Sequence, residues 1–294
     1  VLEHIMDKNR KYLLGMYEKS MPLDLTWEEK LEACKESSFD WIEISIDETD
    51  AKIARLYWSE EERNALKDAI RKTGVPIYTM CFSAQRKYSL GSLGKEKHDK
   101  ALEIMEKAID FAADIGIRII QLAGYDCYYE EENLDTRNEF IKNLKIATNM
   151  AAKKGVVLGF ETMMDRPFID TVEKGMEYVN ICNSPFLGVY PDIGNLAGAK
   201  HDFGYSKSVI DDLKTGVGHI IACHLKETAP HKDRSVSWGT GLTDYENNIK
   251  ILKDMGVRMF NGEFWCDYPD NWENWLIESN TFLRKKLDSV FDEE

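Results

Sequence analysis

Short apolar runs and longer amphipathic segments alternate along this chain of 294 residues. Eight apolar runs have the length and composition of β-strands and lie at Leu13–Tyr17, Trp41–Ile46, Ile77–Phe82, Ile117–Leu122, Val156–Glu161, Phe186–Asp192, His219–His224 and Met259–Phe264. The segments between them carry helix-start signals, including the capping boxes Thr26–Glu29, Ser59–Glu62 and Thr243–Glu246. Eight strands that alternate with helices predict the α/β class and a (β/α)8 TIM barrel.

The two ends of each repeated unit differ in chemistry. Four helices close with a glycine that is followed at once by Val or Ile: Gly74, Gly116, Gly155 and Gly256. This pattern is typical of a left-handed exit from a helix into the next strand. The segments after the strands, such as 127–133 and 228–241, are longer and richer in polar and aromatic residues. We therefore expect function at the face where the strands end.

We expect a single domain, with the barrel over residues 13–294 and an N-terminal extension over 1–12, of which 1–5 read as a non-native remnant before Met6. The segment Asn271–Phe291 predicts a long closing helix that packs on the barrel or forms a subunit interface. An open doubly wound sheet is the alternative architecture. Its dinucleotide-binding form would carry a G-x-G-x-x-G turn after an early strand, and we find none.

Four ionisable residues stand at the ends of four successive predicted strands: Glu161, Asp192, His224 and Glu263. They are 31, 32 and 39 residues apart, and each interval is the length of one β/α unit. Any one of them alone could be a buried polar group with a hydrogen-bonded neighbour. Four together would be costly to bury, and adjacent carboxylates repel unless a cation lies between them. We therefore predict one divalent metal ion, Mn²⁺, Zn²⁺, Co²⁺ or Mg²⁺.

The same residues suggest a reaction. Glu161 on strand five and Glu263 on strand eight would lie roughly opposite each other across the barrel mouth. One carboxylate could take a proton from a sugar carbon and the other could return it on the opposite face. With a metal that polarises the C2 carbonyl, this two-base transfer at C3 passes through a cis-enediolate and predicts a 3-epimerase. An aldose–ketose isomerase and a non-catalytic sugar-phosphate binding protein stay open as alternatives.

Charge and cysteine content narrow the class of partner. Lys and Arg number 38 against 52 Asp and Glu, a formal charge of −14, which argues against nucleic acids and anionic membranes and favours a small-molecule substrate. The six cysteines form no C-x-x-C pair and suggest reduced thiols.

No apolar stretch approaches the roughly 20 residues of a membrane span, and the N-terminus lacks the apolar region of a signal peptide. We expect a cytoplasmic protein.

Several segments carry a resemblance to a known family. They are Gly15-Met-Tyr-Glu-Lys19, Ser45-Ile-Asp-Glu-Thr-Asp50, Ile119-Ile-Gln-Leu-Ala-Gly-Tyr-Asp126, Tyr190-Pro-Asp-Ile-Gly-Asn-Leu196, Gly218-His-Ile-Ile-Ala-Cys-His-Leu-Lys-Glu-Thr228 and Gly262-Glu-Phe-Trp265. Over essentially the whole chain, the sequence resembles the L-ribulose-5-phosphate 3-epimerases, also called L-xylulose-5-phosphate 3-epimerases. The resemblance implies a xylose isomerase-like TIM barrel that interconverts these two ketopentose phosphates in L-ascorbate or L-xylulose breakdown. It also implies a homodimer.

The resemblance assigns roles to individual residues. It makes Glu161 and Glu263 the two bases as well as metal ligands, whereas Asp192 and His224 mainly hold the ion. Related 3-epimerases of unphosphorylated ketohexoses carry a His where this chain has Asn195, which favours the sugar-phosphate branch. Many relatives carry a His at the position of Gln85. An endonuclease of the same superfamily would need more histidines and a basic, DNA-facing surface.

A phosphorylated substrate needs N–H donors and positive charge near the barrel mouth. The candidates are Lys226 just past strand seven, the loop Trp238-Gly239-Thr240-Gly241, and Arg86 with its neighbour Lys87 after strand three. Barrels often bind phosphate after strands seven and eight, which favours the first two. Tyr17 and Glu18 end strand one and could contact substrate hydroxyls. Aromatic residues in loops on this side either pack the loops or form a wall that excludes water: Tyr125, Tyr128, Tyr129, Trp238 and Trp265.

Overall fold

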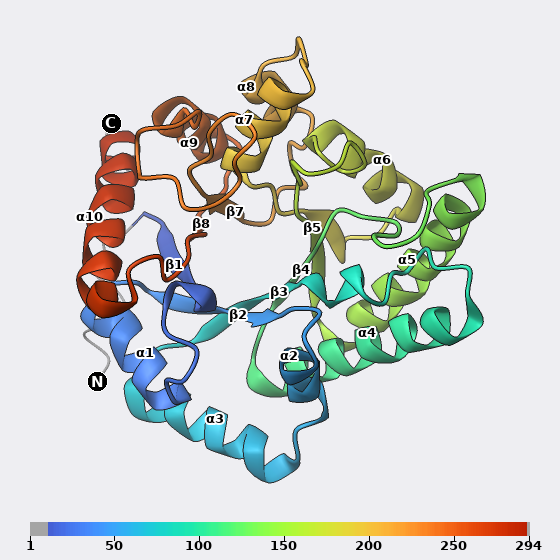
Figure 1. Cartoon of the computed structure of the whole chain (residues 1–294), viewed down its shortest axis with the longest axis horizontal. Coiled ribbons are helices and arrows are strands. Elements are labelled where there is room, and N and C mark those ends of the chain that lie inside the picture. The colour runs from blue at the N-terminus through green and yellow to red at the C-terminus, as the bar shows by residue number, and fades with distance from the viewer. Residues whose placement is uncertain (1–10, 293–294) are drawn as a thin grey trace.

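Eight parallel strands form a barrel surrounded by helices in the computed structural model, which describes residues 11–292 (Figure 1). The strands are β1 (Leu13–Tyr17), β2 (Trp41–Ile46), β3 (Ile77–Phe82), β4 (Ile119–Leu122), β5 (Val157–Phe160), β6 (Leu187–Val189), β7 (Cys223–Leu225) and β8 (Met259–Gly262). They pair in the order β6-β5-β4-β3-β2-β1-β8-β7. Parallel bridges Val189–Ile220 and Asp192–His224 connect the two ends of this sheet. The predicted TIM barrel is confirmed.

The helices lie outside the strands (Figure 1). They are α1 (Trp27–Glu36), α2 (Asp50–Ala54), α3 (Glu60–Thr73), α4 (Lys95–Ile115), α5 (Leu134–Lys154), α6 (Val172–Cys182), α7 (Ile193–Asp202), α8 (Val209–Lys214), α9 (Tyr245–Asp254) and α10 (Trp272–Phe291). Short 3-10 turns occur at Glu18–Ser20, Arg55–Tyr57, Ser83–Arg86 and Pro269–Asn271. The expected closing helix is α10, which packs beside α9 and β8. The proposed remnant at 1–5 lies outside the described residues.

The first three strands have the expected bounds, whereas the later ones are shorter. β6 and β7 keep only three residues each, because the chain around them makes single bridges rather than a regular ladder. Glu161 and Glu263 follow directly after β5 and β8 instead of ending them. Asp192 lies beyond the end of β6, where it makes only a single bridge to His224 and caps α7.

Two of the three predicted capping boxes are present, at Thr26 and at Ser59. The predicted capping box at Thr243 was wrong. Helix α9 is capped by Asp244, whose side chain accepts a backbone N–H of the first turn. Thr243 Oγ1 donates instead to the carbonyl oxygen of Lys226 at 2.8 Å, and this bond connects the start of α9 to the segment after β7.

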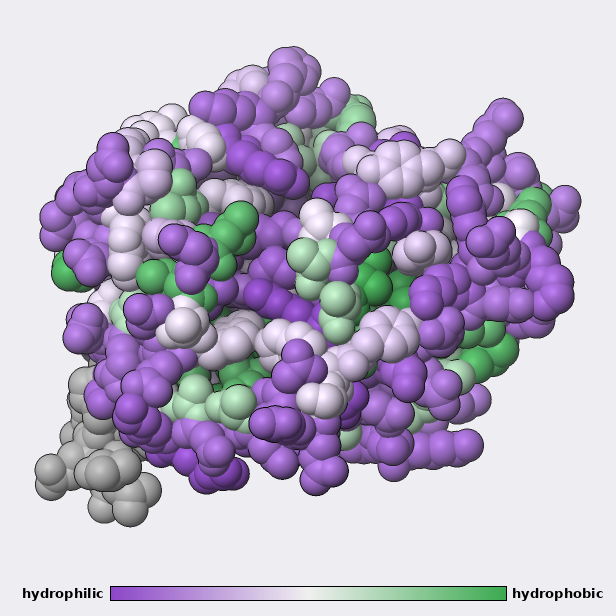
Figure 2. Space-filling view, turned by 60° about the horizontal axis from the view of Figure 1, so that its bottom comes forward, coloured by the Kyte–Doolittle hydropathy of each residue, from purple (hydrophilic) through white to green (hydrophobic). Residues whose placement is uncertain are grey.

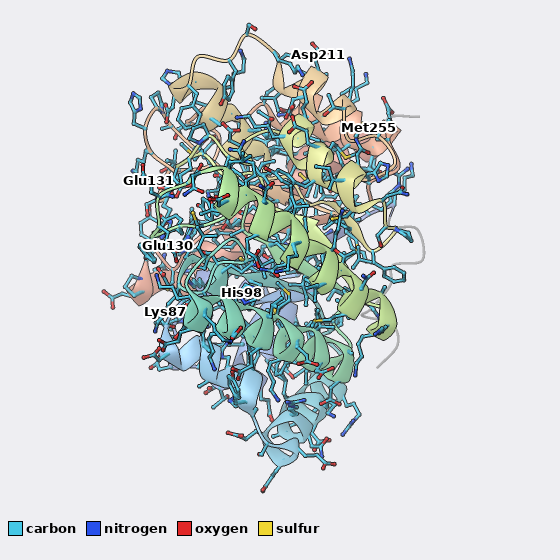
Figure 3. All side chains as sticks on the ribbon, turned by 90° about the vertical axis from the view of Figure 1, so that its right-hand side faces the viewer. Lys87, His98, Glu130, Glu131, Asp211 and Met255 are labelled. Atoms are coloured by element: carbon cyan, nitrogen blue, oxygen red, sulfur yellow. The ribbon has the colours of Figure 1, made fainter. Side chains whose placement is uncertain are left out.

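The loops that follow the strands lie at one end of the barrel, as predicted. Figure 3 places Lys87, Glu130 and Glu131, from the loops after β3 and β4, on the side opposite Met255, where α9 has just ended. Gly256 has a φ of 90°, and the other three helix-closing glycines also lie in the left-handed region. The short helix exits are therefore at one face of the barrel and the long loops are at the other.

Phe160 shows how packing fixes the direction of a site residue. The Phe160 ring is fully buried and faces the helices, with its centroid 6.2 Å from those of Phe140 on α5 and Tyr178 on α6. Burying such a side chain stabilises the fold by about 2–3 kcal/mol. Because successive side chains along an extended chain point in opposite directions, Glu161 is directed inward.

Hydrophilic residues cover most of the face drawn in Figure 2, and hydrophobic residues appear there in smaller, separate areas. Along residues 11–292, no helix is both long enough and apolar enough to cross a membrane.

Candidate metal and substrate site

The four residues predicted as metal ligands come together at the mouth of the barrel. Glu161, Asp192, His224 and Glu263 each offer one ligand atom, and these atoms all lie within 4.8 Å of one another. All four side chains are buried. His224 Nδ1 lies 3.5 Å from Glu161 Oε1, 3.6 Å from Glu263 Oε2 and 3.9 Å from Asp192 Oδ2. We refer to these residues as the carboxylate cluster.

Backbone hydrogen bonds hold each carboxylate at the barrel rim. The Glu161 N–H donates to the carbonyl of Leu122 at 2.8 Å, and the Glu263 N–H donates to that of Leu225 at 3.0 Å. Asp192 uses Oδ1 to accept the backbone N–H of Asn195 at 2.9 Å and so caps α7. Only Oδ2 of Asp192 remains directed at the other three residues.

The chemistry of the donors fits a divalent cation. Within residues 11–292, the buried atoms Asp192 Oδ2 and Glu263 Oε2 accept no hydrogen bond, although Lys226 Nζ lies 3.1 Å from Glu263 Oε2. One ammonium is shared by both oxygens, since Lys226 Nζ also lies 3.8 Å from Asp192 Oδ2, and three buried carboxylates together are costly unless a further cation balances their charge. Three carboxylates and one imidazole suit Mn²⁺, Mg²⁺, Zn²⁺ or Co²⁺. The residues present therefore fit the ion that the sequence predicts.

The charges within the cluster shift one another's protonation. Burial, and then the charge of Glu263, raise the pKa of Glu161 above its usual value. Burial likewise raises the pKa of Asp192 well above its usual range. Burial also acts to raise the pKa of Glu263, but the Lys226 ammonium and His224 outweigh it and hold that pKa well below its usual range. The two glutamates are thus in different electrostatic surroundings.

A second layer of polar residues lies beneath the cluster, inside the barrel, and sequence reasoning missed it. Glu43 Oε1 accepts hydrogen bonds from His224 Nε2 at 2.7 Å and from Asn261 Nδ2 at 3.1 Å. Glu43 Oε2 accepts from Thr79 Oγ1 at 2.6 Å and from Tyr190 OH at 3.1 Å. The available signal was a carboxylate within the otherwise apolar strand W-I-E-I-S-I.

A cavity of about 310 Å³ opens above the carboxylate cluster. Its lining residues are Tyr17, Lys19, Cys81, Ser83, Arg86, Tyr128, Glu161, Met163, Met164, Asp165, Asn195, Lys226, Asp233, Arg234, Glu263 and Trp265. It is large enough for a small, polar ligand in contact with both Glu161 and Glu263. Four positive side chains from three different loops reach it, and we call this cavity the substrate pocket.

Four of the residues proposed for phosphate or substrate contact line the substrate pocket: Lys226, Arg86, Asn195 and Tyr17. Lys226 is buried, with Nζ 3.0 Å from Asn195 Oδ1 and 5.1 Å from the Trp265 ring. The Arg86 guanidinium lies 5.3 Å from the centroid of the Tyr128 ring, which also lines the pocket. The Asn195 side chain is held in place by a hydrogen bond that Nδ2 donates to the backbone carbonyl of Thr162 at 2.9 Å.

The structure does not bring the predicted loop Trp238-Gly239-Thr240-Gly241 to the substrate pocket. The Gly239 N–H donates to the carboxylate of Glu227 at 2.8 Å, and the Trp238 ring stacks on Phe282 of α10. A Cβ at Gly241 would lie 2.0 Å from the carbonyl oxygen of Thr228. These glycines therefore allow this segment of the loop to pack closely against Glu227 and Thr228 at the start of the same loop.

Glu18 also faces away from the substrate pocket, contrary to the expectation of a substrate contact. Its carboxylate pairs with Lys30 at 2.9 Å, with Lys52 at 2.7 Å and with Arg55 at 2.7 Å. Its predicted neighbour Tyr17 does line the pocket.

Other residues near the mouth also depart from the expectations. Gln85 is buried and does not line the pocket, and Lys87 pairs with Asp50. Lys19 and Arg234 do line the pocket and were not predicted.

Comparison with known proteins identifies the family. The model of the family described as "xylose isomerase-like TIM barrel" matches residues 31–286. L-Ribulose-5-phosphate 3-epimerase UlaE of Salmonella paratyphi B is 42% identical over 278 residues, which span 94% of this chain and 95% of that protein. The chain belongs to the L-ribulose-5-phosphate 3-epimerase family. It is therefore an enzyme of the isomerase class.

Solved structures share the fold of this L-ribulose-5-phosphate 3-epimerase family member. The 3-keto-D-glucoside 4-epimerase YcjR from E. coli superposes with a TM-score of 0.73 at 18% identity, over 94% of this chain and 100% of that one. The IOLI protein, described with a binding zinc atom, superposes with a TM-score of 0.73 at 16% identity, over 95% and 99% of the two chains. At such low identity these structures establish the barrel alone.

Proposed function

We propose that this protein is a metal-dependent 3-epimerase that interconverts L-ribulose 5-phosphate and L-xylulose 5-phosphate. The observation that carries the proposal is the placement of Glu161 and Glu263, which extend from β5 and β8 and both line the substrate pocket. The name of the UlaE relative supports the choice of substrate. Epimerisation at C3 needs one group on each face of the carbon, and two carboxylates supply them.

The carboxylate cluster would hold the metal through Glu161, Asp192, His224 and Glu263. When bound, a divalent cation polarises the C2 carbonyl of the ketose and makes the neighbouring C3 hydrogen more acidic. Asp192 and His224 serve to fix the ion, because α7 holds one and Glu43 holds the other in place. Glu161 and Glu263 have the additional role of moving the proton.

In the proposed reaction, one glutamate takes the proton from C3 and gives an enediolate of the substrate. The other glutamate delivers a proton to the opposite face of C3, which inverts that centre. Lys226 lies beside Glu263 and counters its negative charge while substrate is bound. The Tyr128 and Trp265 rings line the pocket and would limit access of water to the enediolate.

The phosphate group would be bound by cations of the pocket wall. Arg86 and Arg234 are the leading candidates, because a guanidinium donates to phosphate through two N–H groups at once. Lys19 lines the same pocket but is paired with Asp47. This set of cations favours a phosphorylated ketose over a free one. The pathway of L-ascorbate breakdown, the homodimer and the cytoplasmic location stay predictions.

The proposal is tested by NMR in D2O with purified protein, L-ribulose 5-phosphate and Mn²⁺ or Zn²⁺, with and without a chelator. We expect deuterium at C3 together with formation of L-xylulose 5-phosphate, both abolished by the chelator. Exchange at C1 with an aldose product would instead identify an aldose–ketose isomerase. Binding of the ketose without any exchange would identify a non-catalytic sugar-phosphate binding protein.

A further inference from the structure

A second group of potential metal ligands lies at the surface, at the end of helix α7. Among residues 11–292, His201, Asp202 and His231 each offer a ligand atom, and these atoms lie within 4.8 Å of one another. His201 and Asp202 are the last two residues of α7, and His231 lies in the loop between β7 and α9. This group shares no residue with the carboxylate cluster, and the proposed epimerisation does not use it.

Asp202 is at the centre of the group. Its Oδ1 lies 2.9 Å from Nδ1 of His201 and 3.2 Å from Nδ1 of His231. These separations are close to the ~3.3 Å between ligand atoms in a tetrahedral site with zinc bonds of ~2.0 Å. The Asp202 side chain is only 11% exposed, whereas the His201 and His231 side chains are 44% and 78% exposed. A partly buried carboxylate is thus combined with two imidazoles that an ion can reach from solvent.

The backbone of His231 is in an uncommon conformation that supports this arrangement. Its φ of 56° lies in the left-handed region, which costs a non-glycine residue about 1 kcal/mol or more. Reciprocal backbone bonds between Ala229 and Lys232, at 3.0 and 2.9 Å, close the turn around it. The His231 N–H donates to Asp202 Oδ1 at 3.1 Å. The turn therefore holds a second imidazole beside the carboxylate.

We propose that His201, Asp202 and His231 bind a borderline divalent transition metal ion, for which Zn²⁺ is the representative. Two nitrogen donors and one oxygen donor favour Zn²⁺, Ni²⁺ or Cu²⁺ over Mg²⁺ and Ca²⁺. Three protein ligands leave at least one coordination position for water. The carboxylate cluster has three oxygen donors and one nitrogen donor, so the two sites differ in metal preference.

This surface site joins two segments that also form the substrate pocket. Helix α7 begins directly after Asp192, and the β7–α9 loop follows the strand that holds His224. Three residues beyond His231 the loop brings Arg234 to the pocket, where its guanidinium lies 4.9 Å from the Trp265 ring. An ion at the surface site fixes the loop that carries Arg234.

Zinc binding to the purified protein tests the proposal. At a free Zn²⁺ concentration of ~1 μM, which selects for sites of micromolar or tighter Kd, bound zinc is counted after equilibrium dialysis. The wild type should hold one Zn²⁺ per chain more than either His201→Ala or His231→Ala, whatever the carboxylate cluster holds. Equal zinc content in the wild type and both variants would overturn the proposal. The comparison is independent of epimerase activity.

His98→Ala is the matched control. His98, on α4 in Figure 3, also contacts carboxylates, with Nδ1 3.1 Å from Asp99 and Nε2 2.9 Å from Glu139, but no second imidazole joins it in a ligand group among residues 11–292. This variant should hold as much zinc as the wild type. If it loses as much zinc as His231→Ala, the ion binds to surface histidines in general and the proposal fails.

Amide hydrogen exchange tests the effect on the loop. Zn²⁺ should slow exchange over residues 229–235 in the wild type by about tenfold or more, and His231→Ala should lose that protection. Because the variant leaves the carboxylate cluster intact, protection of the segments after β5 and β8 should be equal in both proteins. Equal exchange of 229–235 in zinc-loaded wild type and His231→Ala would overturn the role of the ion in fixing this loop.

Discussion

Glu43 accepts a 2.7 Å hydrogen bond from the ring nitrogen of His224 that faces away from the carboxylate cluster. His224 Nδ1 is thereby directed at Glu161, Asp192 and Glu263. Carboxylates in this position fix the tautomer and orientation of a metal-binding histidine and make it a stronger ligand. The position of the candidate metal site therefore depends on a residue of β2, far from the four ligands in sequence.

Glu43→Gln should weaken metal binding. The amide oxygen of the glutamine can still accept a hydrogen bond from His224, but the side chain carries no charge. We therefore expect the affinity for Mn²⁺ or Zn²⁺ to fall by about 10–100-fold. Competition with a chelator of known affinity measures the change without recourse to activity. Glu246→Gln changes a surface glutamate on α9 and is the control, with wild-type affinity expected. Wild-type metal affinity in Glu43→Gln would show that His224 does not need this carboxylate.

Glu161→Gln and Glu263→Gln should each lower kcat for C3 epimerisation by at least ~10²-fold, because each variant lacks one of the two proton-transfer groups. The NMR assay in D2O measures the rate of epimerisation, and circular dichroism checks that each variant is folded. The metal content of each variant must be measured as well, since both residues also face the ion. Full activity in either variant, with metal bound, would remove that glutamate from the two-base mechanism.

Arg234→Ala and Arg86→Ala should raise KM for L-ribulose 5-phosphate by roughly 10–100-fold, because each removes charge-assisted hydrogen bonds of about 1.5–3 kcal/mol. The KM for L-ribulose, which has no phosphate group, should change little in either variant. Equal effects on both sugars would place these arginines outside the phosphate site.

Lys226→Met should behave differently from the arginine variants. Its ammonium lies 3.1 Å from Glu263 Oε2, so its loss changes the surroundings of a proposed base. We expect lower kcat for the phosphorylated and the free ketose alike. A selective rise in KM for the phosphorylated ketose, with kcat unchanged, would instead make Lys226 a phosphate ligand.

The barrel and the four clustered residues could be predicted because both depend on local patterns. Apolar runs recur at one-unit intervals, and parallel strands end at one rim, so charged residues at strand ends must meet. Glu43 could not be assigned in the same way. Its partners His224 and Asn261 are 181 and 218 residues away, and the pattern of β2 alone does not reveal which side chains fill the barrel interior.

The loop residues were harder to predict for a related physical reason. The sequence Trp238-Gly-Thr-Gly241 has glycines that permit close approach, but it does not specify what approaches. In the structure, the partners are Glu227 and the carbonyl of Thr228, both from the same loop. Arg234 was not predicted, and it lines the pocket three residues beyond the turn at His231.

Glu18 should be a determinant of stability in acid, although it is not in the substrate pocket. Its buried carboxylate pairs with Lys30, Lys52 and Arg55. Burial by itself would raise the pKa of Glu18, but Arg55, followed by the two lysines, outweighs it and holds that pKa well below its usual range. A depressed pKa in the folded state stabilises the protein above the unfolded-state value of about 4.3 and less as the pH falls below it.

Glu18→Gln should therefore lower the free energy of unfolding at pH 7 by about 3–5 kcal/mol, because two buried lysines and the partly buried Arg55 lose their counter-charge. Urea denaturation at a series of pH values measures this difference, which should shrink as the pH falls from 5 toward 3, where the wild type begins to lose the same contribution. Glu32→Gln removes a partly exposed glutamate that lies 3.9 Å from Lys35 and should change stability by less than ~1 kcal/mol. A difference between wild type and Glu18→Gln that stays constant over this range would mean that Glu18 stabilises the fold by packing and not by its charge.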